Sequence, residues 1–506
     1  MAEEIIPRWE WRTFGVHFPQ VEEYFAQLEP TGVQESEEVY ILSPNGHTVK
    51  VRFGLMDIKL LREVGAAGLE RWEPVFKAEF PLDRDQIATV FEALAEAPPT
   101  LTRPSYTYEQ FLTEVVEPHP GVRTVPVAKK RTRYTVEGCI GEYSDVRTGG
   151  WLTRTIAIES TDLDAVIAAV RAVGLGSRVN TSYPRGLGAL FDNEPPRYAT
   201  IDVGTNSVKF HIGQPVDGRW ETLVDRAEVT QLGEGLAESG VISQEATART
   251  AEAIRHMVAE ARAHLVREVG AVGTAGLRIA ENRQDVLQAI ELHAGVPVEV
   301  ISGEEESRLA YLAALSGLGR QHGDVVVFDT GGGSSQFTFG QGAEVSERFS
   351  VDVGAARYTE QFGLAAAVDS DTIAAAKAAI AEGLQRLDGR PVPDELVGMG
   401  GALTNMTAVM LGLARYDPDR VQGAILTRDE IERQIGLYAS MAADARRAIV
   451  GLQPKRAEVM LAGACIVATV MDTLGKDRLT VSDRGLRHGL IVERFGDGEV
   501  EVLDVP

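Results

Sequence analysis

The sequence predicts an α/β protein with two similar lobes, preceded by an α+β domain built on an antiparallel sheet. The carboxyl-terminal part twice contains an apolar strand that runs into a glycine-bearing turn and a second strand. The two units are roughly 130 residues apart, which suggests two similar domains facing one cleft. The amino-terminal part has short runs of alternating polarity, as half-buried strands do. A chain of 506 residues also exceeds what one hydrophobic core usually serves.

In the amino-terminal domain, which we place at 1–190, alternation predicts strands at 39–42, 48–53, 132–136 and 154–159. Apolar periodicity predicts helices at 83–95 and 162–173. Two proline-containing segments interrupt the chain. Segment 117–127 is interpreted as an internal loop. Segment 191–197 has consecutive prolines, which exclude helix and disfavour a central strand, so it predicts a domain boundary.

Beyond this boundary we expect a first lobe at 197–318 and a second lobe at 319–506. Each lobe opens with a buried strand, at 198–203 and 325–329, followed by a glycine turn and another strand. Long helices are predicted at 246–265 and 372–387.

Composition limits the functional classes. The formal net charge of −24, with 74 acidic and 50 basic residues, argues against a protein that binds duplex nucleic acid. An anionic substrate must then be attracted locally, by backbone N–H groups, a few placed Arg and Lys, and a divalent cation. The alternative is that the acidity serves solubility.

The same composition bears on location. No stretch approaches the roughly 20 apolar residues that span a bilayer, and the acidic start has no apolar core of a secretory signal. We therefore expect no membrane partner. Cys139 and Cys465 are far apart, which argues against a disulfide framework and favours the cytoplasm. A homodimer stays open.

Two glycine-rich turns are the main candidates for phosphate and cation binding. In 202–207 (DVGTNS) and 329–335 (DTGGGSS), an Asp ends an apolar strand and glycines follow at once. Glycine lets backbone N–H groups approach an anion, and an Asp at a strand end can hold a divalent cation through water. Asp202 and Asp329 are the candidate metal ligands. The candidate phosphate-binding residues are Gly204, Thr205, Asn206, Ser207, Gly331, Gly332, Gly333 and Ser334. Singly, each turn is better explained as an ordinary glycine-rich hairpin.

Two further glycine turns follow apolar strands and precede helices, at 397–404 (VGMGGALT) and 481–489 (VSDRGLRHG). The second of these places Asp483 and Arg487 near a helix start. Each could simply be a helix cap.

The turns at 202–207 and 329–335 resemble the two phosphate motifs of the superfamily of actin, Hsp70 chaperones and sugar kinases. Segments 272–283 (VGTAGLRIAENR), 298–315 (VEVISGEEESRLAYLAAL) and 481–490 resemble one branch of it, the exopolyphosphatase/guanosine pentaphosphate phosphohydrolase (Ppx/GppA) family. The resemblance implies an actin-like ATPase (ribonuclease H-like) fold of two lobes. The turn at 400–404 reads GGALT where the family usually has GGT, so the role of Thr404 stays open.

The resemblance also implies catalytic roles. The family's catalytic Glu matches Glu306, with Glu305 beside it, and its phosphate-contacting Arg matches Arg278. A Glu at a helix start can orient the attacking water. The alternatives are an acidic helix N-terminus, favoured by the helix dipole, and a surface ion pair for Arg278. Mg²⁺, with Mn²⁺ as the alternative, is the implied cofactor.

The amino-terminal domain more distantly resembles the CYTH fold of triphosphate tunnel enzymes, an antiparallel barrel with Lys, Arg and Glu inside. That family's Glu-x-Glu-x-Lys signature matches 8–12 (RWEWR), where Arg8 and Arg12 replace the first Glu and the Lys. A second acidic pair is reduced to Glu159. Fewer carboxylates should weaken metal binding, so a binding or regulatory tunnel is favoured over a second active site. The alternative is that the basic residues lie on solvated strand faces.

The leading functional hypothesis is an exopolyphosphatase that releases orthophosphate from the ends of inorganic polyphosphate. The same chemistry on guanosine pentaphosphate is the nearest alternative. A non-catalytic sensor of polyphosphate or of a guanosine polyphosphate, and an ATP-using kinase of the superfamily, are the others.

Overall fold

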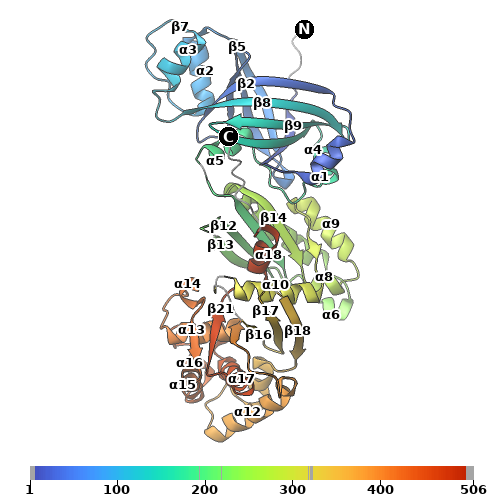
Figure 1. Ribbon diagram of the computed structural model, residues 1–506, viewed down its shortest axis with the longest axis vertical. Coiled ribbons are helices and arrows are strands. Elements are labelled where there is room, and N and C mark those ends of the chain that lie inside the picture. Colours follow the sequence, from blue (N-terminus) through green and yellow to red (C-terminus); the bar gives the residue numbers. More distant parts are fainter. Residues whose placement is uncertain are drawn as a thin grey trace. The chain divides into compact units, whose positions relative to one another are not determined.

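The computed structural model describes residues 6–192, 194–217, 219–316, 318, 323–342 and 344–496. The chain folds into two compact units that meet in the sequence between Val300 and Ile301. The first unit contains a β-barrel and one α/β lobe, and the second contains another α/β lobe (Figure 1). No helix in these ranges is both long and apolar enough to cross a membrane.

The barrel is closed and entirely antiparallel, with the strand order β1-β10-β9-β8-β2-β3-β4-β5. It confirms the antiparallel barrel expected from the sequence. Its strands are β1 (Arg8–Gly15), β2 (Gly32–Leu42), β3 (Thr48–Arg52), β4 (Leu55–Val64), β5 (Glu70–Glu79), β8 (Arg123–Val136), β9 (Cys139–Thr148) and β10 (Trp151–Ser160). Closure between β1 and β5 leaves no free sheet edge.

Charged side chains alternate along the strands between the barrel interior and the outside. Lys129 and Arg131 on β8 are buried, whereas Lys130 between them is exposed. Lys50 on β3 is buried in the same way. The alternative that these basic residues lie on solvated strand faces is therefore wrong for the inward positions.

Helices cover the barrel at several places (Figure 1). Predicted helices at 83–95 and 162–173 are confirmed as α2 (Arg84–Leu94) and α4 (Leu163–Ala172), each with an Asp N-cap. The other elements are α1 (Pro19–Ala26), η1 (Ala66–Gly68), β6 (Leu82–Asp83), β7 (Ser105–Tyr106), α3 (Tyr108–Gln110), η2 (Phe111–Val116) and α5 (Tyr183–Phe191).

The predicted loop at 117–127 is wrong in its second half, where β8 already begins at Arg123. Pro126 lies inside this strand and is paired with Val39 of β2. The neighbour on the other side, β9, pairs with β8 only from Ala128 onward. Pro126 is tolerated because its missing N–H falls where one side of the strand is unpaired.

The first lobe is a five-stranded mixed sheet in the order β13-β12-β11-β14-β15. Its strands are β11 (Arg197–Val203), β12 (Ser207–Val216), β13 (Arg219–Val229), β14 (Val266–Gly273) and β15 (Glu299–Val300). Its helices are α6 (Leu236–Ser239), α7 (Gln244–Ala263), α8 (Ala275–Ile279) and α9 (Arg283–Ala294). Helix α7 confirms the helix predicted at 246–265.

The second lobe repeats this plan in a six-stranded sheet of order β18-β17-β16-β19-β21-β20. Its strands are β16 (Asp324–Thr330), β17 (Ser335–Gln341), β18 (Glu344–Val351), β19 (Glu395–Met399), β20 (Ile425–Thr427) and β21 (Arg478–Ser482). The helices are α10 (Gly303–Leu315), α11 (Ala355–Phe362), α12 (Ser370–Gly383), η3 (Gln385–Leu387), α13 (Gly401–Met410), α14 (Pro418–Val421), α15 (Arg428–Ala439), α16 (Ala443–Arg446), η4 (Pro454–Arg456), α17 (Met460–Thr473) and α18 (Leu486–Phe495). Helix α17, buried on all sides, is the centre of its core.

Within the first unit, buried polar contacts join the barrel to the lobe. Arg262 of α7 forms a hydrogen-bonded ion pair with Glu70 of β5, and both side chains are almost fully buried. Glu268 of β14 binds Arg178 at 3.1 Å and the hydroxyl of Ser177 at 2.7 Å. The barrel and the first lobe therefore share an interface rather than a simple linker.

Candidate functional site

The first glycine turn connects β11 to β12. The N–H of Gly204 donates to the carbonyl of Ser207 (3.1 Å), which closes the turn. Asp202, only 3% exposed, pairs in the ladder with Lys209, whose Nζ lies 3.0 Å from Asp202 Oδ2. Lys209 therefore forms an ion pair with one oxygen of the carboxylate at the foot of the turn.

The second glycine turn connects β16 to β17 and has the same construction. The N–H of Gly331 donates to the carbonyl of Ser334 (2.9 Å), and Asp329 pairs with Gln336, again seven residues further on. Each hairpin is also flanked by a parallel strand, β14 in one lobe and β19 in the other. The strand–turn–strand repeat predicted from the sequence is thus confirmed in detail.

Hydrogen bonds to the carbonyls fix where the turns present their N–H groups. In the first turn, the carbonyls of Thr205 and Asn206 accept bonds from the 230–233 loop. In the second, the carbonyls of Gly331 and Gly332 accept bonds from the start of α11. Because C=O and the following N–H point in opposite directions in a trans peptide, the N–H groups of residues 206, 207, 332 and 333 face away from these loops. Each turn therefore presents two successive donors, as anion-binding turns do.

Arg278 is carried on α8, which follows β14. Thr274, just before this helix, donates its N–H to the carbonyl of Val203 (3.2 Å), and Gly276 packs closely against Thr205. This contact places α8 beside the first turn. In the first unit the structure thus brings Arg278 together with the predicted residues at 202–207.

In the second lobe, the third and fourth glycine turns lie at the ends of neighbouring parallel strands, β19 and β21. Gly400 of the third turn lies against the carboxylate of Asp329. Asp483 of the fourth turn accepts a hydrogen bond from the hydroxyl of Tyr416 (2.7 Å). Thr404 lies in the first turn of α13 and is 8% exposed.

The acidic run sits in the first turn of α10. Ser302 caps this helix by accepting the N–H of Glu305 (3.0 Å). Arg308 donates to both carboxylate oxygens of Glu305 (3.0 and 2.7 Å) and also binds Glu493 of α18. These hydrogen bonds lower the pKa of Glu305. Glu305 is therefore held as a carboxylate by an arginine, which suits positioning better than proton transfer.

Three side chains that shape these sites were missed at the level of sequence: Lys209, Arg308 and Arg348. Arg348 of β18 binds the carbonyl of Gly303 and the hydroxyl of Ser307, which anchors the first turn of α10. Arg308 had a signal, because it lies three residues after Glu305 on a helix. Arg348 had none, because its contact joins segments 41 to 45 residues apart.

Oxygen ligands for a cation are sparse within each lobe. The described residues contain no group of three or more His, Cys, Asp or Glu side chains that could hold a metal ion. Asp202 and Asp329 each stand at a strand end, and the donor set at each is one carboxylate. This fits a cation such as Mg²⁺, which keeps several waters and is bound by one or two carboxylates together with substrate phosphates.

A second cluster of charge fills the barrel interior around Glu38, whose side chain is fully buried. Lys50, Lys129 and Arg52 surround its carboxylate at 3.0, 3.5 and 3.9 Å. Burial alone would raise the pKa of Glu38, but the three cations outweigh it and bring the pKa to about 2. Conversely, burial and the charge of Lys129 lower the pKa of Lys50 to about 7.

Glu142, further along the interior, is bound in the same way by Arg12 at 3.5 Å and Arg131 at 3.3 Å. Arg12 also binds Glu10 at 2.8 Å. The neighbouring cavity is lined by more basic side chains than acidic ones: Arg12, Lys50, Arg52, Lys59, Lys129, Arg131 and Arg133 against Glu10, Glu142 and Glu159. A divalent cation does not fit here, because Glu38 is bound by three basic side chains and Glu142 by two, whereas Asp202 is paired with one lysine.

The barrel interior is closed at one end. Tyr40 and Tyr183 stack there (5.3 Å between ring centroids), and Tyr183 belongs to α5. Behind them an apolar cluster fills the barrel: Leu42, Val125, Val127, Val146 and Leu187. The charged cavity is therefore a blind pocket.

The two-lobed fold and its paired glycine turns are those of the actin-like ATPase class. Residues 212–497, more than half of the chain, match the model of the Ppx/GppA phosphatase family. The chain belongs to that family.

Individual relatives cover the same part of the chain. It is 31% identical over 323 residues to exopolyphosphatase 2 of Mycobacterium tuberculosis (59% of this chain, 99% of the relative). It is 27% identical over 308 residues to the bifunctional 3-dehydroquinate synthase/phosphatase of Fusobacterium nucleatum, of which it spans 46%. Among solved structures, the Aquifex aeolicus Ppx/GppA phosphatase, type II variant, matches with a TM-score of 0.56 and 31% identity, over 59% of this chain and 99% of that chain.

Proposed function

We propose that this protein is an exopolyphosphatase, which hydrolyses terminal phosphoanhydride bonds of inorganic polyphosphate and releases orthophosphate. Membership of the Ppx/GppA family and the relative named exopolyphosphatase 2 support a hydrolase of this kind. The observation that carries the proposal is the shared construction of the two glycine turns, each with an Asp at its foot and two outward N–H donors.

In the proposed mechanism each turn binds phosphate. The N–H groups of residues 206, 207, 332 and 333 bind phosphate oxygens, and Arg278 adds a bidentate contact. Glu306 orients the attacking water toward the terminal phosphorus, while Glu305, tied to Arg308, keeps the helix start in place. Asp202 and Asp329 would hold Mg²⁺, or Mn²⁺, through water. When bound, the cation supplies neutralisation of the phosphate oxygens.

Substrate choice is tested by phosphate release from purified protein. We expect release from long-chain polyphosphate in the presence of Mg²⁺, with a lower kcat/KM on guanosine pentaphosphate. The opposite preference would assign the guanosine pentaphosphate phosphohydrolase activity instead. Binding of both without any release would indicate a non-catalytic sensor.

The involvement of both lobes has its own test. Arg278→Ala in the first lobe and Ser334→Ala in the second should each raise KM. An unchanged KM in either variant would contradict the phosphate-binding role of that residue. We also propose a cytoplasmic location, consistent with the buried free thiols Cys139 and Cys465.

For the barrel we propose a binding rather than a catalytic role. Its blind pocket would take the end of a polyanion, and the excess of basic side chains would bind it without a divalent cation. Calorimetric titration with inorganic tripolyphosphate in excess EDTA should give binding in wild-type protein and at least about tenfold weaker binding in Lys129→Met. Lys130→Met, the neighbouring exposed position, is the control. Binding that needs Mg²⁺ would contradict this role.

A further inference from the structure

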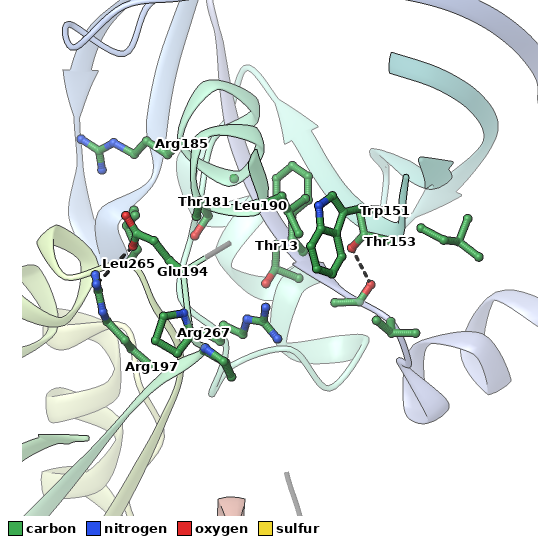
Figure 2. A pocket seen from close by; sticks show the side chains of 18 of the residues that line it. Thr13, Trp151, Thr153, Thr181, Arg185, Leu190, Glu194, Arg197, Leu265 and Arg267 are labelled. Carbon is green, nitrogen blue, oxygen red and sulfur yellow. Dashed lines mark hydrogen bonds and ion pairs between the residues drawn. The ribbon is translucent and has the colours of Figure 1, made fainter. Parts of the chain in front are cut away.

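A cavity of about 280 Å³ lies between the barrel and the first lobe, within the first unit. We refer to it as the junction pocket. Strands β1 and β10 and helix α5 line it on the barrel side, and the start of β14 lines it on the lobe side (Figure 2). Its volume is close to the lower end of the range for small-molecule sites, about 300–1,000 Å³, and such sites favour domain interfaces.

Most of the wall is apolar and one part of it is aromatic. Trp151, at the start of β10, is only partly buried and turns its indole into the cavity beside Thr13 (Figure 2). Phe14, also in the wall, is held edge-on by Tyr183 at 5.4 Å. The indole of Trp151 therefore offers the free aromatic surface of the pocket, on which a flat ring can stack.

Some of the charged side chains that line the pocket have ion-pair or hydrogen-bond partners, and others have none in the described part of the chain. Glu194 is bound by Arg197 at 3.2 Å, and Arg197 also donates to the carbonyl of His264. The side chain of Arg185 points away from Trp151 (Figure 2). Its positive charge acts on the buried carboxyl of Glu70. Among the arginines that line the pocket, Arg267 is therefore the one available to bind a ligand.

Arg267 is a half-buried guanidinium on β14. Its backbone carbonyl accepts the N–H of Val179 (3.1 Å), but its side chain makes no hydrogen bond or ion pair with any residue that the structure describes. Figure 2 shows it extending from the lobe toward Thr13 and Trp151 of the barrel. A planar guanidinium in this position is suited to bidentate binding of a phosphate or carboxylate.

We propose that the junction pocket binds a purine nucleotide, with the base stacked on Trp151 and the phosphate held by Arg267. A flat aromatic ring that carries an anion matches the two groups that the pocket presents, and the hydroxyls of Thr13, Thr153 and Thr181 add hydrogen-bonding partners. Sites for ligands of this kind are mostly apolar with few polar anchors.

Such a ligand would touch both parts of the first unit and the strand that leads to the phosphate turn. β14 carries Arg267 near its start and ends at Gly273, directly before Thr274 and the helix with Arg278. A nucleotide bound at Arg267 would therefore hold the barrel against the lobe and act as a regulator of the first phosphate turn.

The test uses the full-length protein with AMP, adenosine and inorganic phosphate as separate probes in calorimetry. AMP should bind at least about tenfold more tightly than adenosine, and phosphate alone should not bind this pocket measurably. Arg267→Ala should reduce AMP binding to the level of adenosine and leave adenosine unchanged. Trp151→Ala should weaken both by about fivefold or more, because stacking is lost.

The location is tested by photolabelling with 8-azido-AMP and peptide mapping. Label should appear on the peptide that contains Trp151 and should be lost in Arg267→Ala. Arg147→Ala, an exposed arginine on the preceding strand β9, is the matched control and should label like the wild type. Labelling confined to other peptides, or equal AMP affinity in wild type and Arg267→Ala, would overturn the proposal.

Discussion

Gly400 lies so close to Asp329 that a Cβ at position 400 would be 1.9 Å from Oδ1 of the aspartate. The glycine also has a φ of +91°, a region that side chains with a Cβ rarely adopt. The third glycine turn is thus fitted directly against the Asp at the foot of the second turn. The third turn, which also starts helix α13, therefore lies directly beside the Asp of the second turn.

Gly400→Ala should therefore displace the carboxylate of Asp329. We expect a fall in kcat of about 100-fold, the size of effect that a displacement of about 1 Å in a site can produce. Gly412→Ala is the control, because Gly412 also has a positive φ (+62°) but nothing within 4 Å of its virtual Cβ. Steady-state phosphate release and thermal melting of both variants separate the two effects. Equal losses of activity in both would mean that backbone strain, and not Asp329, is responsible.

Glu306→Gln keeps the shape of the side chain and removes its charge. If Glu306 orients the water, kcat should fall by about 10²- to 10⁴-fold while polyphosphate still binds. Glu304→Gln, an exposed member of the same acidic run, should retain near-wild-type turnover. Glu305→Gln should behave differently from both, because it frees one side of Arg308, which also binds Glu493. Turnover of Glu306→Gln close to the wild-type rate would show that another group has this role.

Much of the fold could be predicted because local signals agreed with it. Asp83 and Asp162 are N-cap residues that mark the starts of their helices in the sequence. The first and second glycine turns each follow a mostly apolar strand. The loop predicted around Pro126 is wrong because a proline is compatible with a strand where one neighbouring strand is absent, and strand pairing cannot be inferred from one segment alone.

In the candidate site, too, only the residues that belong to local sequence motifs could be predicted. Glycines, Asp202, Asp329 and the acidic run stand in local motifs and could be named from the sequence. The ion pair of Lys209 with Asp202 depends on hairpin register, and the anchoring of α10 by Arg348 depends on contacts that are distant in the chain. Pairing of Glu38 with Lys129 likewise requires the barrel to close. Such tertiary contacts have no local signature.

Lys50 should make polyanion binding in the barrel dependent on pH. Burial lowers the pKa of Lys50 to about 7, so the folded protein has largely lost this proton at pH 8, whereas the unfolded chain keeps it. A bound polyanion would favour the charged form and raise the pKa again. Tripolyphosphate binding should therefore weaken as pH rises from 6 to 8.5, and near pH 7.5 it should take up protons.

Proton uptake is measured by calorimetry in buffers of different ionisation enthalpy. Lys50→Met should abolish most of the uptake, and Lys130→Met, which changes an exposed lysine on β8, should leave it intact. Uptake of the same size in Lys50→Met would show that another group titrates.

The ion pair of Glu70 with Arg262 should be the most costly single contact to break between barrel and lobe. Both side chains are nearly fully buried, and Glu70 also accepts a hydrogen bond from the indole N–H of Trp72 (3.2 Å). Arg262→Met would leave this buried carboxylate without its cation, at a cost of about 3–5 kcal/mol. Burial already raises the pKa of Glu70, so in the variant the carboxyl should take up a proton and the loss of stability should be smaller at pH 5 than at pH 8. The double variant Glu70→Gln/Arg262→Met removes both charges and should recover part of the loss at pH 8. Chemical denaturation at both pH values measures these differences, and a single variant as stable as the double at pH 8 would mean that the pair contributes little to the interface.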